Sequence, residues 1–233
     1  THYLSNAPIV PGRAEGYEVG EGNGFVNEEP LSMTLPFAAG SLGASVQDLL
    51  AWQRALLSGS AVSHASYEAM TARGSLIDGN PMHYGYGLRL SEEHGLVKVS
   101  HGGGINGFRA QLAFYPEVGL GIAVLINSGS GRPGLLENRI ARAVLKMEQP
   151  EVTEIQIPES ELRRCVGSYD PGRSPVTVRF EEGALFGFGE RLVPVDEGVF
   201  HPKDDPFTRI VCEAGVEDVV APALTLTAGG VTT

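Results

Sequence analysis

The residues of this chain best suited to chemistry are His101 and the three glycines that follow it, Gly102, Gly103 and Gly104. An imidazole can accept or donate a proton near neutral pH. Three consecutive glycines leave a stretch of backbone without Cβ atoms, so a ligand or another chain can come close to its amide groups. Together these residues predict one wall of a catalytic cleft.

The sequence around His101 predicts a sheet that holds this wall in place. Residues 97–100 alternate apolar and other side chains, residues 108–114 form a second apolar-rich segment, and a turn at residues 116–119 leads to a third segment ending at Asn127. Neighbouring residues on a strand face opposite sides of the sheet. Ser100 and His101 therefore cannot act as a nucleophile and its base, and we expect Ser100 on the far face.

The sequence argues against a dinucleotide-binding site and against a metal site. Gly102, Gly104 and Gly107 match the spacing of the dinucleotide-binding fingerprint, but that motif must open a helix. Here a strand is predicted next, and no acidic residue stands about 20 positions further on. The histidines show no metal-ligand spacing. We therefore expect no nucleotide, no metal and no other cofactor.

Helical patterns flank the predicted sheet. Ser45 and Asp48 form a capping box at the start of an amphipathic helix that ends before Gly59. Residues 63–72 predict a short second helix. Residues 134–148 predict a third, whose apolar face would consist of Leu135, Leu136, Ile140, Val144 and Leu145. Glycines and prolines interrupt residues 1–36, which we expect to be irregular.

The composition changes after Glu148. Residues 149–158 read as an interdomain linker. Short strand patterns then recur at regular spacing and predict a small antiparallel sheet or part of a barrel; they are residues 175–180, 184–188, 192–195, 208–212 and 224–227. Cys165 and Cys212 are too few for a disulfide framework or a metal cluster. We expect both to be free buried thiols, and the alternative is a single disulfide between them.

The overall charge limits the partners. The chain has 233 residues, 42% of them hydrophobic, and a formal net charge of −11. This length and composition allow a sizeable core in one large or two small domains. An acidic balance argues against binding to nucleic acids or anionic membrane surfaces. No run of consecutive apolar residues reaches the roughly 18–20 residues that a membrane-spanning helix needs. The compartment stays open between periplasmic, secreted and cytoplasmic.

Four patches, in order, resemble the serine β-lactamase-like hydrolases: class C β-lactamases, DD-peptidases, D-aminopeptidases and related esterases. His101-Gly102-Gly103 is similar to their third motif, written K-T-G, H-x-G or W-G-G. The other patches are AGSLGAS at 39–45 with Asp48-Leu49 before a helix, YGYGL at 84–88 where a strand begins, and the hairpin from Phe114 to Asn127 with its C-terminal helix. The resemblance covers residues 13–148.

The resemblance implies roles for individual residues. The backbone N–H of Gly104 would be the second donor to the oxyanion of an acyl-transfer reaction. His101 would position a substrate carboxylate or assist proton movement. Gly102, Gly103 and Asn106 would contact the substrate, a small acyl compound such as a peptide, ester or amide. H-x-G in place of K-T-G leans toward peptidase or esterase chemistry over β-lactam hydrolysis.

The family's nucleophile is missing from the sequence. Members use the Ser of S-x-x-K and the Tyr of Y-x-N. Here the residues three places before Lys98, Lys146 and Lys203 are glycine, alanine and phenylalanine, and no tyrosine starts a Y-x-N. We therefore expect a C-terminal portion of a longer hydrolase, inactive alone. The alternatives are a non-catalytic binding module and a half-protein that self-associates or pairs with a missing N-terminal half.

The fold implied is α+β: an antiparallel sheet with packed helices at residues 1–148, a linker at 149–158 and a small all-β domain at 159–233. The last domain resembles the lipocalin-like domain appended to some of these hydrolases. Its opening pattern is Cys165-Val166-Gly167-Ser168-Tyr169.

Overall fold

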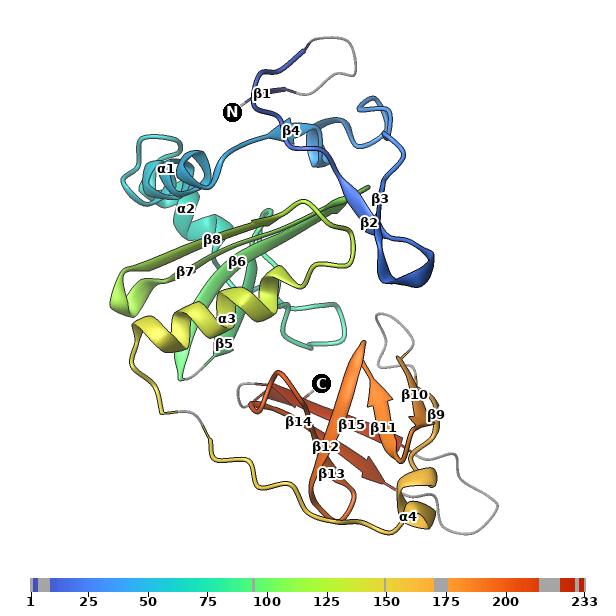
Figure 1. Ribbon diagram of the computed structural model, residues 1–233. Coiled ribbons are helices and arrows are strands. Elements are labelled where there is room, and N and C mark those ends of the chain that lie inside the picture. Colours follow the sequence, from blue (N-terminus) through green and yellow to red (C-terminus); the bar gives the residue numbers. More distant parts are fainter. Residues whose placement is uncertain are drawn as a thin grey trace. The chain divides into compact units, whose positions relative to one another are not determined.

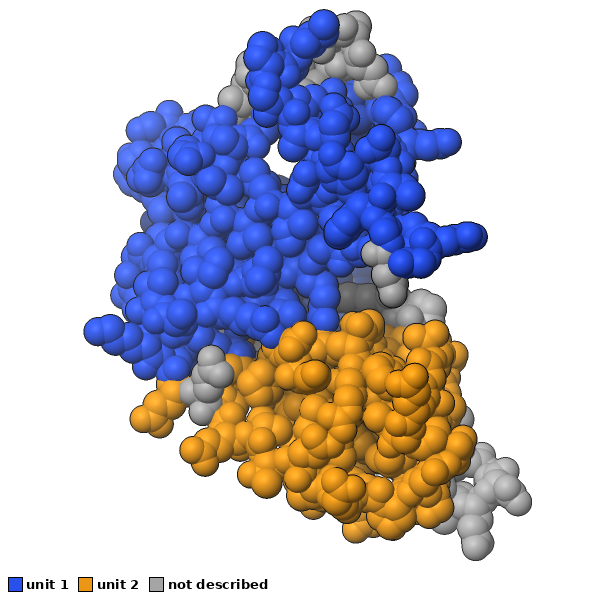
Figure 2. All heavy atoms as spheres, in the orientation of Figure 1, with its two compact units in different colours: residues 1–91, 96–147 blue, residues 92–95, 148–233 orange. Residues whose placement is uncertain are grey.

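The computed structural model describes residues 2–3, 9–93, 95–148, 150–169, 176–213, 223–228 and 231–232. The chain divides into two compact units, shown in separate colours in Figure 2. Unit 1 consists of residues 1–91 and 96–147, and unit 2 of residues 92–95 and 148–233. The fold is mixed α and β with antiparallel sheets, as the sequence predicts.

A four-stranded sheet forms the centre of unit 1 (Figure 1). Its strands, in spatial order, are β5 (Arg89–Glu93), β6 (Leu96–Ile105), β7 (Phe108–Tyr115) and β8 (Leu120–Ile126). The three strands predicted around His101 are confirmed. The β7–β8 turn is the short 3-10 helix η3 (Pro116–Val118), which ends at Gly119 with φ 64°. A left-handed backbone of this kind favours glycine.

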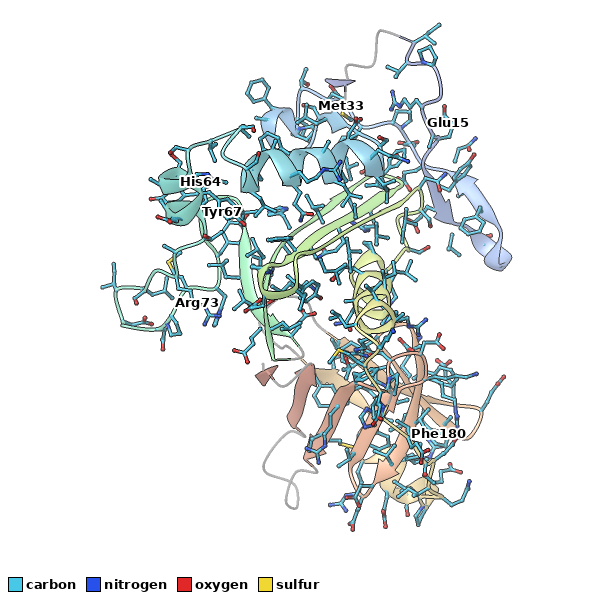
Figure 3. The ribbon with its side chains drawn as sticks, turned by 90° about the vertical axis from the view of Figure 1, so that its left-hand side faces the viewer. Glu15, Met33, His64, Tyr67, Arg73 and Phe180 are labelled. Carbon is cyan, nitrogen blue, oxygen red and sulfur yellow. A yellow bond between two sulfur atoms is a disulfide. The ribbon has the colours of Figure 1, made fainter. Side chains whose placement is uncertain are left out.

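Helices cover both faces of this sheet, α1 on one and α3 on the other (Figure 3). Helix α1 (Val46–Leu57) begins at the predicted capping box, where the Ser45 side chain accepts from the Asp48 N–H and the Asp48 carboxylate accepts from the Ser45 N–H. The side chain of Gln53 on α1 donates to the Ala113 carbonyl at 3.0 Å. The second predicted helix is α2 (His64–Met70).

The third predicted helix is α3 (Pro133–Val144), but most of its apolar face is exposed. Leu136, Ile140 and Val144 are 42%, 42% and 56% exposed. The helix instead buries Glu137, Ala141 and Arg142. Glu137 and Ala141 are one helical turn apart, so they lie on the same side of α3. Its orientation is set by what Glu137 binds.

Glu137 binds two side chains from the sheet. Its Oε2 forms an ion pair with Lys98 Nζ on β6, and its Oε1 accepts from the Tyr115 hydroxyl on β7 at 2.8 Å. Glu137 and Tyr115 are fully buried, and Lys98 is 4% exposed. Buried charges are stable only when they are paired and hydrogen-bonded. We call Lys98, Tyr115 and Glu137 the buried ionic cluster; it fixes α3 on β6 and β7.

The N-terminal region is more regular than predicted. A hairpin of β2 (Tyr17–Val19) and β3 (Phe25–Asn27) lies within it, with the 3-10 turn η1 (Glu21–Asn23) between. Tyr17 also forms a parallel bridge to Ser128, just after β8. The hairpin is therefore also joined to a distant part of the chain. The remaining short elements of this region are β1 (His2–Tyr3), η2 (Phe37–Ala39) and β4 (Leu42–Gly43), with β1 paired to β4.

Unit 2 is an eight-stranded antiparallel sheet in which each strand pairs with its neighbours in sequence. All five predicted strands are present. The short helix α4 (Glu159–Arg163) precedes the sheet. The strands are β9 (Gly167–Tyr169), β10 (Val176–Glu181), β11 (Ala184–Gly187), β12 (Glu190–Asp196), β13 (Val199–Pro202), β14 (Thr208–Glu213), β15 (Ala223–Ala228) and β16 (Val231–Thr232).

The expectation of free thiols is wrong, because Cys165 and Cys212 form a disulfide with a Cα–Cα separation of 5.9 Å. Both residues are buried and belong to the core of unit 2. The disulfide joins the residue two positions after α4 to β14, across 47 residues of sequence. The Tyr169 hydroxyl donates to the Cys165 carbonyl at 2.7 Å beside the disulfide, and burial raises the pKa of Tyr169.

The segment that the sequence suggests as a linker has no regular secondary structure over residues 150–158. It is nevertheless attached to β12. Ile155 N–H donates to the Pro194 carbonyl at 3.0 Å, and Glu154 forms an ion pair with Arg191. The Arg191 guanidinium lowers the pKa of Glu154. In the described part of the chain, no helix is both long and apolar enough to cross a membrane.

Candidate active site

The glycine-rich stretch lies in the second half of β6. Strand β6 has 10 residues and β5 has 5, and only residues 94 and 95 separate them. Because the two strands are joined by so short a turn, β5 reaches only the first half of β6. The second half, from His101 to Ile105, pairs with β7 alone among the described strands. His101 and its three glycines are exposed along this edge.

The register of β6 and β7 separates His101 from Ser100, as predicted. His101 is paired with Leu112 and Ser100 with Ala113. Ser100 and Lys98 share one face, and Lys98 binds α3. His101 therefore points to the opposite face, which α1 covers further along the sheet. Ser100 is 3% exposed, so it is not positioned as a nucleophile for His101.

The imidazole of His101 has one partner that the sequence analysis did not assign to the site. His101 Nε2 lies 2.7 Å from the Tyr84 hydroxyl, and the two rings meet edge to face with centroids 5.8 Å apart. A hydrogen bond of this length fixes the ring orientation of His101. The only sequence signal for Tyr84 is its place in the YGYGL patch, which we expected to begin a strand.

Residues 84–88 instead form a tight loop, and the strand begins at Arg89. Tyr84 forms a bridge to Arg89, and Gly85 N–H donates to the Leu88 carbonyl at 2.7 Å. A Cβ at Gly85 would collide with the Met70 carbonyl at the end of α2. Glycine is therefore required there for the loop to pack on α2 and hold Tyr84 against His101.

The three glycines are not equivalent. On the α3 face, a Cβ at Gly104 would collide with the guanidinium of Arg109, whose Nε donates to the Gly129 carbonyl at 2.7 Å. A Cβ at Gly102 would lie 3.1 Å from Gln111 Oε1. Gly103 is on the face of His101, and a Cβ there would meet only Ala110, at 3.5 Å. The space beside His101 is therefore open to a ligand.

Asn106 lies in the turn that joins β6 to β7. Its Nδ2 donates to the Glu29 carbonyl at 3.2 Å, which ties this turn to the N-terminal region. Gly107 follows with φ 70°, and a Cβ there would lie 2.6 Å from Gly16 Cα. The observed role of Asn106 is thus to hold the turn, while its contact with a substrate stays a prediction.

A small cavity adjoins His101 on its own face of the sheet. It has a volume of about 130 Å³ and is lined by residues of α1, α2, the 84–88 loop, β6 and β7; they are Trp52, Gln53, Leu56, Leu57, Tyr67, Gly87, Leu88, Val99, Ser100, His101, Leu112 and Phe114. Burial raises the pKa of Tyr67, which keeps its phenol neutral. Among the residues that the structure describes, no group of three or more His, Cys, Asp or Glu side chains is arranged to hold a metal ion.

Comparisons with known proteins agree with this geometry. A family model described as Beta-lactamase matches residues 1–146. The D-aminopeptidase of Cereibacter sphaeroides strain KD131 is 29% identical over 170 residues, which cover 70% of this chain and 32% of that protein. The D-aminopeptidase of Gluconobacter oxydans strain 621H is 28% identical over 110 residues, covering 47% and 21%. The chain thus spans about a third or less of the length of these curated relatives.

A solved structure shares the fold. The octameric penicillin-binding protein homologue from Pyrococcus abyssi aligns with a TM-score of 0.52 at 20% sequence identity. The alignment covers 91% of this chain and 49% of that one.

Proposed function

This chain belongs to the serine β-lactamase-like family of hydrolases, and on that premise we propose that β6 forms one wall of an acyl-hydrolase site. The observation that carries the proposal is the pairing of His101 with Tyr84 beside an exposed, side-chain-free edge of the sheet. The Gly104 N–H donates one hydrogen bond to the oxyanion that forms when a serine attacks the acyl carbon. Gly102 and Gly103 leave room for the substrate backbone.

His101 acts on protons or on a substrate carboxylate in this proposal. Its Nε2 and the Tyr84 oxygen are within hydrogen-bonding distance, so either group can pass a proton to the other. The relatives named D-aminopeptidase favour a peptide or amide substrate with an acyl group from a D-amino acid. The serine nucleophile and its lysine come from polypeptide outside these 233 residues, because the sequence contains no S-x-x-K.

The purified chain is therefore inactive by itself. Incubation with nitrocefin, p-nitrophenyl acetate and D-alanine p-nitroanilide gives no turnover above the rate in buffer. Catalytic turnover that is blocked by a serine-directed phosphonate would overturn this part of the proposal, since it would require a nucleophile within the chain.

The role of His101 is tested in a chimera. Residues 13–146 replace the matching segment of the Cereibacter sphaeroides D-aminopeptidase, so that the host supplies the rest of its own site. In this chimera, His101→Ala lowers kcat/KM by about 100-fold or more, the usual range for loss of a proton-transfer group. Tyr84→Phe lowers it less, and Tyr86→Phe is the matched control because Tyr86 is 75% exposed two positions away. Equal activities of all four chimeras, at unchanged Tm, would refute the role of His101.

A second function, as a partner of another polypeptide, is favoured by the outer face of α3. Leu136, Ile140 and Val144 form an exposed apolar stripe at a spacing of four residues. An exposed stripe of this kind is typical of an interface. We propose that it is covered by a second copy of the chain. Sedimentation velocity at rising concentration then shows a dimer, and Leu136→Glu with Ile140→Lys returns it to a monomer. A wild-type monomer at all concentrations would refute self-association.

A further inference from the structure

The cavity beside His101 has the properties of a binding site for an apolar group. Its lining contains no Asp, Glu, Lys or Arg side chain. Gln53 is engaged, since its amide donates to the Ala113 carbonyl at 3.0 Å. Ser100 is 3% exposed and lies on a strand position that faces α3. A cationic ligand group would therefore find no ionic partner inside the cavity, and an anionic one could pair only with His101, whereas an apolar group would contact mostly apolar side chains.

The size of the cavity limits what it can hold. An engineered cavity of about 150 Å³ with an apolar lining binds benzene. The volume here is about 130 Å³. It therefore accommodates one branched aliphatic or small aromatic side chain. Trp52, on α1, is 52% exposed and gives the cavity an apolar rim that is accessible from solvent.

The position of the cavity connects it to the reaction. His101 belongs both to the lining and to the hydrogen bond with Tyr84. Val99 and Leu112 form part of the wall, two positions before His101 on β6 and directly across from it on β7. A substrate whose reacting carbonyl lies along the exposed half of β6 can place a neighbouring side chain in this cavity without displacing backbone.

We propose that this cavity binds the side chain of the acyl substrate and selects branched aliphatic or small aromatic groups over methyl and over cationic groups. This inference rests on the hydrolase function proposed above, but it can be tested without catalysis. Trp52 is the only tryptophan of the chain. Its fluorescence therefore reports directly on ligand that enters the cavity.

The test is a fluorescence titration of the intact chain with three amides that differ in the acyl group: isovaleramide, acetamide and the cationic 4-aminobutyramide. Isovaleramide gives a saturable change in Trp52 emission with a Kd at least tenfold below that of acetamide, because burying its isobutyl group removes more apolar surface from water. 4-Aminobutyramide, whose ammonium group finds no carboxylate in the lining, gives no saturable change. Equal responses to all three amides, or no saturable response to isovaleramide, would overturn the proposal.

Variants localise the binding. Leu112→Phe fills the cavity and abolishes the isovaleramide response. Val118→Phe is the matched control: it makes an aromatic change at a residue of η3 that is 47% exposed and does not line the cavity, and it keeps the response. Leu112→Ala enlarges the cavity and shifts preference toward phenylacetamide, which keeps the test decisive if Leu112→Phe does not fold. An unchanged isovaleramide Kd in both folded Leu112 variants would overturn the proposal.

The two proposals fail separately. Loss of the isovaleramide response in these titrations refutes only the proposal that the cavity binds the acyl side chain, since no turnover is measured. Loss of any effect of His101→Ala in the chimera refutes the hydrolase role of β6 and leaves side-chain binding as a property of the cavity.

Discussion

The buried ionic cluster is the most sensitive point in unit 1, because it places two opposite charges in the interior. Glu137 is 0% exposed and Lys98 is 4% exposed. We predict that Glu137→Gln lowers the free energy of unfolding by about 3–5 kcal/mol, since the Lys98 ammonium loses its carboxylate and stays buried. The amide oxygen of glutamine can still accept from the Tyr115 hydroxyl, so most of the loss comes from the charge.

Removing the whole cluster should cost much less than removing one member. In Lys98→Met/Tyr115→Phe/Glu137→Leu, the interior contains neither an unpaired charge nor a hydroxyl without an acceptor. Buried ion pairs replaced by apolar residues of similar volume are often neutral or more stable, by up to about 4 kcal/mol. We therefore expect the triple variant to be more stable than Glu137→Gln by about 2 kcal/mol or more.

Urea unfolding monitored by Trp52 fluorescence measures both changes, because Trp52 is in the same unit. Glu68→Gln on α2 is the control for loss of an exposed carboxylate, and it should change stability by less than about 0.5 kcal/mol. A Glu137→Gln variant that loses no more stability than this control would refute the destabilising effect of the unpaired Lys98 ammonium. That effect is also refuted if the triple variant is less stable than the single one.

Three further predictions concern other parts of the chain. Replacing Cys165 and Cys212 by alanine removes a cross-link over 47 residues and should destabilise unit 2 by about 4 kcal/mol, according to the loop-entropy relation. Urea unfolding followed by far-UV circular dichroism measures this loss. No change in stability would show that the disulfide is not needed to hold this part of unit 2 together. Burial lowers the pKa of His201, so the unfolded state binds its proton first. The stability of unit 2 should therefore fall as the pH drops below about 6.5 and should be less pH-dependent in His201→Gln. The same pH dependence in both proteins would refute this role of His201. Ser45→Ala removes the acceptor for the Asp48 N–H and should cost about 1 kcal/mol by Trp52-monitored unfolding, and a change below 0.3 kcal/mol would show that the cap is dispensable.

Local signals in the sequence were sufficient for most elements. The capping box at Ser45 predicts the start of α1 because both of its hydrogen bonds lie within four residues. The strands of both units follow from alternating side chains between turn residues. The hairpin of β2 and β3 was not predicted because its glycines suggest irregular structure, and its further bridge from Tyr17 to Ser128 joins residues far apart in the chain.

Signals that depend on distant partners failed in two places. The sequence predicts an apolar face of α3 that contains Leu136 and Ile140, yet the helix buries Glu137, because Glu137 pairs with Lys98, 39 residues earlier. The pairing of Cys165 with Cys212 likewise depends on how the strands of unit 2 are ordered. For the candidate site, the sequence indicates His101 through its glycines, but the contact with Tyr84 depends on the loop between α2 and β5.

The strand order of unit 2 has a consequence for how this part of the chain acquires its structure. From β9 to β16, each strand in the sheet is next to the strand that precedes it in sequence. Contacts close in sequence require little loop-closure entropy, and domains rich in them fold faster than those with distant pairings. The sheet can therefore grow hairpin by hairpin as synthesis proceeds. The disulfide can form only after β14 has been synthesised, because Cys212 lies in this strand and Cys165 precedes β9.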